Sequence, residues 1–193
     1  MSRLVVVLPL TPLCTGDSFP VSDWPLHITV LPPFHTDAAA SEIGQVIAAT
    51  AAGRTALTVV AGAGALFGRR EDVPVTLVEE HPALTGLHRA LVDAVRPLAS
   101  SPDEPAFTGP GFRAHITVKN GVRVHAGEAL PLTQIALVDM APRSAAGGRT
   151  VLATFALPAP GAESGSAEPF ADDEESEEQS ERDRQSESDD IQH

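Results

Sequence analysis

The chain has 193 residues, and its charge is concentrated towards the C-terminal end. The net charge is −13, of which residues 161–193 contribute −11 (13 acids, two bases) and residues 1–160 only −2 (13 acids, 11 bases). A strongly basic protein that coats nucleic acid is excluded, because such proteins draw most of their affinity from neutralising several phosphates at once.

The single Cys14 excludes an internal disulfide and any zinc site built on paired cysteines, and it fits a reducing cytoplasm. Pro9 and Pro12 interrupt the N-terminal apolar run, and no small-residue cleavage site follows, so this run is predicted to be a buried strand rather than a signal peptide. No window approaches about 18 uninterrupted apolar residues, the length that a membrane span requires. We therefore expect a cytoplasmic protein without a membrane partner.

Short runs of β-branched and aliphatic residues between turn signals predict strands, and two amphipathic stretches predict helices. Gly62, Gly64 and Gly68 are interpreted as turn glycines, since no Lys and Ser or Thr follow to complete a phosphate-binding loop. In chain order, the predicted elements are strands Leu4–Leu8 and Leu26–Leu31, helix Asp37–Ala52, strands Ala56–Val60 and Val73–Val78, a helix with the apolar stripe Leu84–Leu98, and strands Ala114–Lys119, Gln134–Asp139 and Thr150–Ala156. Strands mixed with two helices, without strict alternation, predict an α+β domain.

The composition changes near Pro158 to Gly161. Beyond this point the chain is rich in Ser, Glu and Asp and has almost no aliphatic residues, so it cannot bury enough apolar surface to offset its ordering entropy. We predict one domain over residues 1–160 and a disordered acidic tail over residues 161–193. The tail is interpreted as a solubilising segment, with the sharper hypothesis that it competes with RNA for the domain.

A four-residue sequence occurs twice in the predicted domain. His-Ile-Thr-Val begins at His27 and again at His115, 88 residues further on. Side chains alternate along a strand, so each copy would anchor its Ile in the core and present its His and Thr on the other face. Arg113 and Lys119 lie in phase with the second pair, and Arg113 is the stronger candidate for contact with phosphate. If the two halves of the chain are related by a pseudo-twofold axis, these two faces are expected to meet across a cleft.

Two imidazoles at one cleft are a competent general base and general acid near neutral pH. Two hydroxyls beside them can donate hydrogen bonds to the oxygens of a phosphoryl group, and an arginine supplies a fixed positive charge suited to phosphate. The candidate site is therefore His27, Thr29, His115 and Thr117 for catalysis and Arg113 for substrate binding. This scheme requires neither a metal nor a cofactor.

These residues resemble the 2H phosphoesterase superfamily, whose 2′-5′ RNA ligase-like members carry two His-x-Thr/Ser motifs on paired lobes. The resemblance covers most of residues 1–157 and includes Pro32–Phe34, Phe112 and the glycines of residues 62–68. It implies a bilobed fold with antiparallel sheets around a central cleft and helices outside, and metal-independent chemistry on cyclic phosphates or 2′-5′ phosphodiesters of RNA or nucleotides. One motif histidine would act as base, the other as acid, and the threonine hydroxyls would hold the phosphate. Ala114 replaces the proline that many relatives have before the second motif histidine.

Several alternatives stay open at this point. A zinc site would have to recruit His35 or His125, and His81 and His88 are interpreted as structural or solvated. A platform for base stacking is not obvious, and its candidates are Trp24, Phe34 and Phe67. The runner-up function is a non-catalytic module that binds nucleotides or RNA ends, and a third is an adaptor whose acidic tail is its working part. The natural substrate, the choice between hydrolysis and ligation, and the oligomeric state do not follow from the sequence.

Overall fold

A computed structural model of the chain describes residues 1–99, 108–140 and 148–161. Its compact unit spans Met1–Ala162. The predicted acidic tail lies outside the described residues, apart from Gly161. No helix in the described part of the chain has the length and apolarity to cross a membrane.

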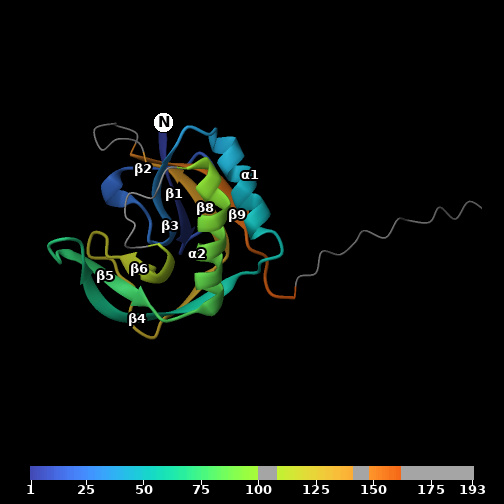
Figure 1. The fold of residues 1–193 in the computed structure, drawn as a ribbon. Helices are drawn as coiled ribbons and strands as arrows, with labels where there is room; N and C mark the ends of the chain where they lie inside the picture. Colours follow the sequence, from blue (N-terminus) through green and yellow to red (C-terminus); the bar gives the residue numbers. More distant parts are fainter. Residues whose placement is uncertain (100–107, 141–147, 162–193) are drawn as a thin grey trace, which may run out of the picture. The chain divides into compact units, whose positions relative to one another are not determined.

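Nine strands in the described residues form one antiparallel sheet in the order β2-β9-β8-β1-β3-β6-β5-β4-β7 (Figure 1). The strands are β1 (Ser2–Pro9), β2 (Ser18–Phe19), β3 (His27–Thr36), β4 (Leu57–Phe67), β5 (Val73–Val78), β6 (His115–Thr117), β7 (Ala129–Leu132), β8 (Gln134–Asp139) and β9 (Arg149–Ala156). With two helices packed on this sheet, the predicted α+β class is confirmed.

The helices α1 (Ala40–Ala51) and α2 (Pro82–Val95) lie beside each other against the sheet, where α1 contacts β9 and α2 contacts β3 (Figure 1). Short 3₁₀ turns η1 (Val21–Asp23), η2 (Arg96–Leu98) and η4 (Gly109–Gly111) join the elements. Ile43 and Ile47 of α1, with Leu84 and Leu91 of α2, are fully buried in the same apolar core as Ile28 and Ile116 of the sheet. Burial of this apolar face therefore fixes the helices on one side of the strands that carry the repeated motif.

A second, smaller apolar cluster lies elsewhere in the unit. It contains Val5 and Val7 of β1, with Trp24, Val138 and Val151. Val7 pairs with Thr29, and directly paired residues share a face, so this cluster packs on the same sheet face as the motif side chains. Thr29 and His27 therefore adjoin this cluster, through Val7 and Trp24 respectively.

The sequence-based boundaries differ from the structure most clearly at β3, β4 and β6, and β3 continues to Thr36. Strand β4 continues to Phe67, so Gly62 and Gly64 lie inside a strand rather than in turns. A register shift between Ala61 and Gly64 marks a bulge, and a Cβ on Gly62 would lie 3.4 Å from the Leu77 carbonyl oxygen. Only Gly68, at φ +90°, takes the turn role predicted for all three. Strand β6 is shorter than predicted.

Candidate active site

The two copies of the motif lie on neighbouring strands of one sheet. Strand β3 pairs antiparallel with β6 through Ile28 and Ile116. An antiparallel pair has a local twofold axis, and carrying this register one residue either way sets His27 opposite Thr117 and His115 opposite Thr29. The two motifs are therefore related by a local twofold axis and lie side by side on neighbouring strands.

All four predicted catalytic side chains share one sheet face. Ile28 and Ile116 are buried on the helix side of the sheet, whereas His27, Thr29, His115 and Thr117 are half-buried on the other side. The strand alternation expected from the sequence explains this division. The sheet thus presents two imidazoles and two hydroxyls to one region, and each is partly open to solvent.

Each motif histidine makes the same local hydrogen bond. Nδ1 of His27 lies 2.6 Å from the Pro25 carbonyl oxygen, and Nδ1 of His115 lies 2.8 Å from the Arg113 carbonyl oxygen. A carbonyl oxygen only accepts, so in both rings Nδ1 carries the proton and donates it. In the neutral ring Nε2 is then the proton acceptor, which is the arrangement that a general base needs.

An aromatic ring packs against each motif histidine. Trp24 lies 4.0 Å from His27 between ring centroids, and Phe67 lies 4.6 Å from His115. An arginine guanidinium lies over each of these aromatic rings. Arg149 lies 5.7 Å from the Trp24 ring centroid, and Arg113 lies 5.3 Å from the Phe67 ring centroid. These distances fit cation–π contacts. The rings restrict the motion of both imidazoles and exclude water from one side of each.

The surroundings of both histidines favour their neutral forms. Burial lowers the pKa of His27 to about 4, the Pro25 carbonyl opposes this shift, and the charges of Lys119 and His115 add to it. Burial also lowers the pKa of His115, with the Arg113 carbonyl opposing and the Arg113 charge adding. A positive charge nearby disfavours protonation of an imidazole. The free site therefore holds two neutral imidazoles at neutral pH.

Two cations and one amide frame the site. Arg113 is exposed beside His115, as predicted, and Lys119 lies close enough to His27 for its charge to act on that ring. The Asn120 side-chain amide donates to the Ser22 carbonyl oxygen and to Asp23 Oδ1, each at 3.2 Å. These bonds tie the segment after the second motif to the segment before the first.

The zinc alternative finds no set of ligands in the described part of the chain. Within residues 1–99, 108–140 and 148–161, no three His, Cys, Asp or Glu side chains gather as an ion site requires. His35 pairs with Arg3 at the far end of β3 from His27, and His125 is exposed. Whether the activity is independent of metal stays a prediction.

Of the three aromatic side chains considered for base stacking, two are buried. Phe34 is 1% exposed within the main core, so it has no free face. Trp24 is also buried, whereas Phe67 is half-buried beside His115. Packing of Phe34 under the helices could not be read from its position in the sequence, because its burial depends on distant elements.

Lys119 is a weaker candidate than Arg113 from the sequence, and Asn120 is not predicted as a site residue. Lys119 is in phase with Arg113, His115 and Thr117, and that alternation was the available signal. Asn120 has φ +48°, a left-handed conformation in which Asn is enriched, and it precedes a glycine. The turn was therefore readable, but its contact with residues 22 and 23 was not.

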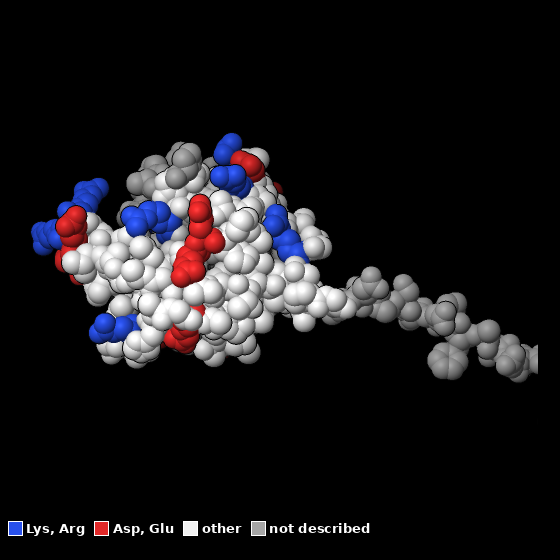
Figure 2. Space-filling model, turned by 90° about the horizontal axis from the view of Figure 1, so that it is seen from below, with Lys and Arg blue, Asp and Glu red and all other residues white. Residues whose placement is uncertain are grey.

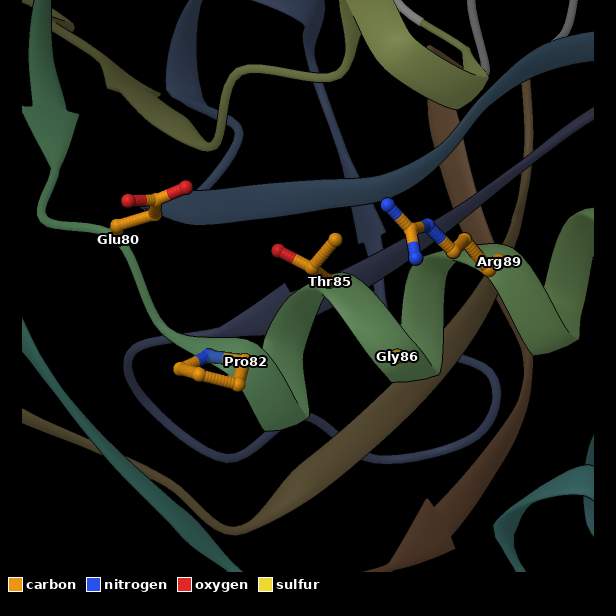
Figure 3. A pocket seen from close by; sticks show the side chains of 5 residues that line it. All are labelled: Glu80, Pro82, Thr85, Gly86 and Arg89. Atoms are coloured by element: carbon orange, nitrogen blue, oxygen red, sulfur yellow. The ribbon is translucent and has the colours of Figure 1, made fainter.

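A hollow of about 340 Å³ lies elsewhere, along the start of α2 (Figure 3). Its lining contains the side chains of Glu80, Thr85 and Arg89, which lie in a row, but no predicted site residue. On the face in Figure 2, Lys and Arg side chains are interspersed with Asp and Glu rather than gathered into one basic patch. This face therefore lacks the continuous positive charge that a protein needs to coat a nucleic acid, and any nucleic acid on it would be held at a small site.

Comparison with known proteins identifies the family of the chain. A family model described as the 2′-5′ RNA ligase superfamily matches residues 15–136, which is more than half of the chain and includes both motifs. No match was found among curated proteins.

Two solved proteins illustrate the structural similarity. The chain is similar to TT0787 of Thermus thermophilus, with 18% identity, a TM-score of 0.53, and coverage of 82% of this chain and 99% of that one. It is also similar to E. coli LigT complexed with phosphate (18% identity, TM-score 0.52) and with NADP+ (17% identity, TM-score 0.51), each covering 81% of this chain and 98% of that one. At this identity the similarity shows the fold.

Proposed function

Because the chain belongs to the 2′-5′ RNA ligase superfamily of 2H phosphoesterases, we propose that it is a metal-independent phosphoesterase acting on 2′,3′-cyclic phosphate or 2′-5′ phosphodiester bonds of RNA or nucleotides. The observation that carries this proposal is the matched pair of His-x-Thr motifs around the Ile28–Ile116 pair. The complexes of E. coli LigT with phosphate and with NADP+ support a nucleotide phosphate as the ligand class. A cytoplasmic location, which the single Cys14 favours, belongs to the same proposal.

Phosphate binding would change the protonation of the site. Both imidazoles are neutral in the free protein, and an anion between them favours a positive charge on one. Burial lowers the pKa of His27 to about 4, and the charge of Lys119, with that of His115 once this ring is protonated, adds to the shift, so His27 stays neutral more readily. We therefore assign His27 as the general base and His115 as the general acid in hydrolysis of a cyclic phosphate.

The proposed hydrolysis has the following steps. Nε2 of His27 takes a proton from a water molecule, whose oxygen forms the new bond to phosphorus. The bond between phosphorus and one of the two ribose oxygens of the cyclic phosphate breaks, and Nε2 of protonated His115 gives its proton to that leaving oxygen. Thr29 and Thr117 donate hydrogen bonds to the non-bridging oxygens, and Arg113 offsets their charge. The two histidines then exchange a proton with solvent and are ready for another turnover.

A turnover assay with EDTA present tests the proposal. The substrates are the four 2′,3′-cyclic nucleotides, a short RNA ending in a cyclic phosphate, and a 2′-5′ linked dinucleotide. We expect wild type to turn over at least one of them and His115→Ala to lose about two to four orders of magnitude, the usual worth of general acid catalysis.

His125→Ala is the matched control, because it removes an exposed histidine outside the motifs. This control should keep wild-type turnover. Binding of a cyclic nucleotide without turnover of any substrate would instead favour the non-catalytic binding module, and loss of activity in EDTA would contradict the metal-independent mechanism.

A further inference from the structure

His88 lies in α2, outside the repeated motif, and its side chain is completely buried. Both ring nitrogens are hydrogen bonded. Nδ1 lies 2.8 Å from the Val30 carbonyl oxygen, and the backbone N–H of Gly109 donates to Nε2 at 3.1 Å. The ring also stacks on Phe112, with centroids 3.9 Å apart and an interplanar angle of 6°. One imidazole thus contacts two segments that are far apart in the sequence.

The two segments are those that carry the motif histidines. Val30 follows Thr29 directly in β3. Phe112 immediately precedes Arg113, whose carbonyl oxygen holds Nδ1 of His115. His88 therefore contacts the first motif just after its threonine and the second motif three residues before its histidine, from the helix side of the sheet.

The chemistry of this position requires a neutral imidazole. The Val30 carbonyl needs a donor and the Gly109 N–H needs an acceptor, and only the tautomer with its proton on Nδ1 provides both. Burial lowers the pKa of His88, the Val30 carbonyl opposes this, and the charge of the neighbouring Arg89 adds to it. An apolar side chain here would leave two backbone groups without these partners, which is costly in a buried place.

We propose that His88 is a positioning residue that holds β3 and residues 109–112 in a fixed relation and so sets the placement of His115 relative to His27. The inference rests on the proposed phosphoesterase function for its kinetic consequence. Its structural consequence, a fixed orientation of the His115 ring, does not depend on any substrate.

Three variants test the proposal. His88→Phe keeps an aromatic ring against Phe112 but removes both hydrogen bonds. His88→Gln offers an amide N–H for Val30 and an amide oxygen for Gly109, and so serves as the conservative rescue. His81→Ala is the matched control, because His81 only caps α2 by accepting from the Leu84 N–H at 3.4 Å.

We expect His88→Phe to lower kcat by about 10- to 100-fold with KM changed by less than about twofold, since small displacements of catalytic groups carry costs of this size. His88→Gln should restore a large part of kcat. His81→Ala should weaken α2 without changing kcat. The imidazole nitrogen signals of His115 in NMR spectra should report one Nδ1–H tautomer in wild type and a mixture in His88→Phe.

A folded His88→Phe protein with wild-type kcat and an unchanged His115 tautomer would overturn the proposal, and so would an equal loss of kcat in His81→Ala. If wild type turns over no substrate, the proposed function fails, but the NMR comparison still decides the positioning role. Circular dichroism of each variant shows whether it is folded.

Discussion

The electrostatics of individual residues define how the two histidines differ. Each donates Nδ1–H to the carbonyl two residues earlier, and each packs on an aromatic ring. Their cations differ, because Lys119 acts on His27 and Arg113 acts on His115. Since both pKa values lie below 6.5, we expect kcat/KM to reach its maximum below pH 6.5 and to fall above it, as the acid loses its proton.

Removing one cation at a time assigns the two limbs of this pH profile. Lys119→Gln removes a charge that lowers the pKa of His27, so the acidic limb, which reports the base, should move to higher pH. Arg113→Gln should move the alkaline limb to higher pH for the same reason at His115. Arg96→Gln, an exposed arginine paired with Asp93, is the control. If Lys119→Gln moves the alkaline limb, the roles of the histidines are reversed.

Alternation along the strands was enough to predict the shared face of His27, Thr29, His115 and Thr117. It could not give their aromatic neighbours, because Phe67 reaches His115 only after β4, β5 and β6 are paired. The same holds for His88, which the sequence marks as structural without showing that it joins both motif segments.

At the scale of elements, pairing of β3 with β6 brings the motifs together. Ile28 and Ile116 form the paired residues and are at most 1% exposed. We predict that Ile116→Ala lowers the free energy of unfolding by about 2–5 kcal/mol, the usual range for such a truncation. It should also lower kcat about tenfold, because the cavity lies directly beneath the catalytic face.

Urea denaturation and steady-state kinetics check this prediction, with Ile43→Ala as the control. Ile43 is equally buried but lies in α1, which packs against α2 and β9. The control should show a similar loss of stability and an unchanged kcat. A loss of kcat in proportion to stability in both variants would contradict a specific role for the β3–β6 pair.

Continuous β-branched and aliphatic runs predicted β1, β5 and β8 closely, since buried strands of this kind have few other interpretations. Strand β7 was missed because Ala-Leu-Pro-Leu is short and contains a proline, which a strand at the edge of a sheet tolerates. Strand β2 has only two residues. Its pairing with β9 depends on a contact between distant segments.

At the scale of the whole molecule, three histidines link stability to pH. Burial lowers the pKa of His27, His88 and His115 in the folded state, so the unfolded state binds more protons below 6.5. With respect to these three groups, the free energy of unfolding is therefore highest above pH 6.5. It decreases as the pH falls towards the pKa values of the histidines in the folded state. We expect the free energy of unfolding, measured in urea, to decrease between pH 7 and about pH 5, where most carboxylates stay ionised. A constant value over this range would contradict the prediction.

The predicted domain boundary has a separate test. If residues 1–160 form the domain, a chain that ends at Pro160 should unfold at the same urea concentration as the full chain and keep its kcat. A rise in RNA affinity at low salt would support competition by the removed acidic residues, and unchanged affinity would remove that idea. A large loss of stability would show that the boundary is wrong.

The most direct measurement is kcat for hydrolysis of a 2′,3′-cyclic phosphate by wild type, His27→Ala, His115→Ala and the double variant. The account predicts that each single variant loses about two to four orders of magnitude. The double variant should lose little more than the worse single one, because a base and an acid that act in one step are not additive. Wild-type kcat in either single variant would contradict the claim that the two motif histidines form the catalytic pair.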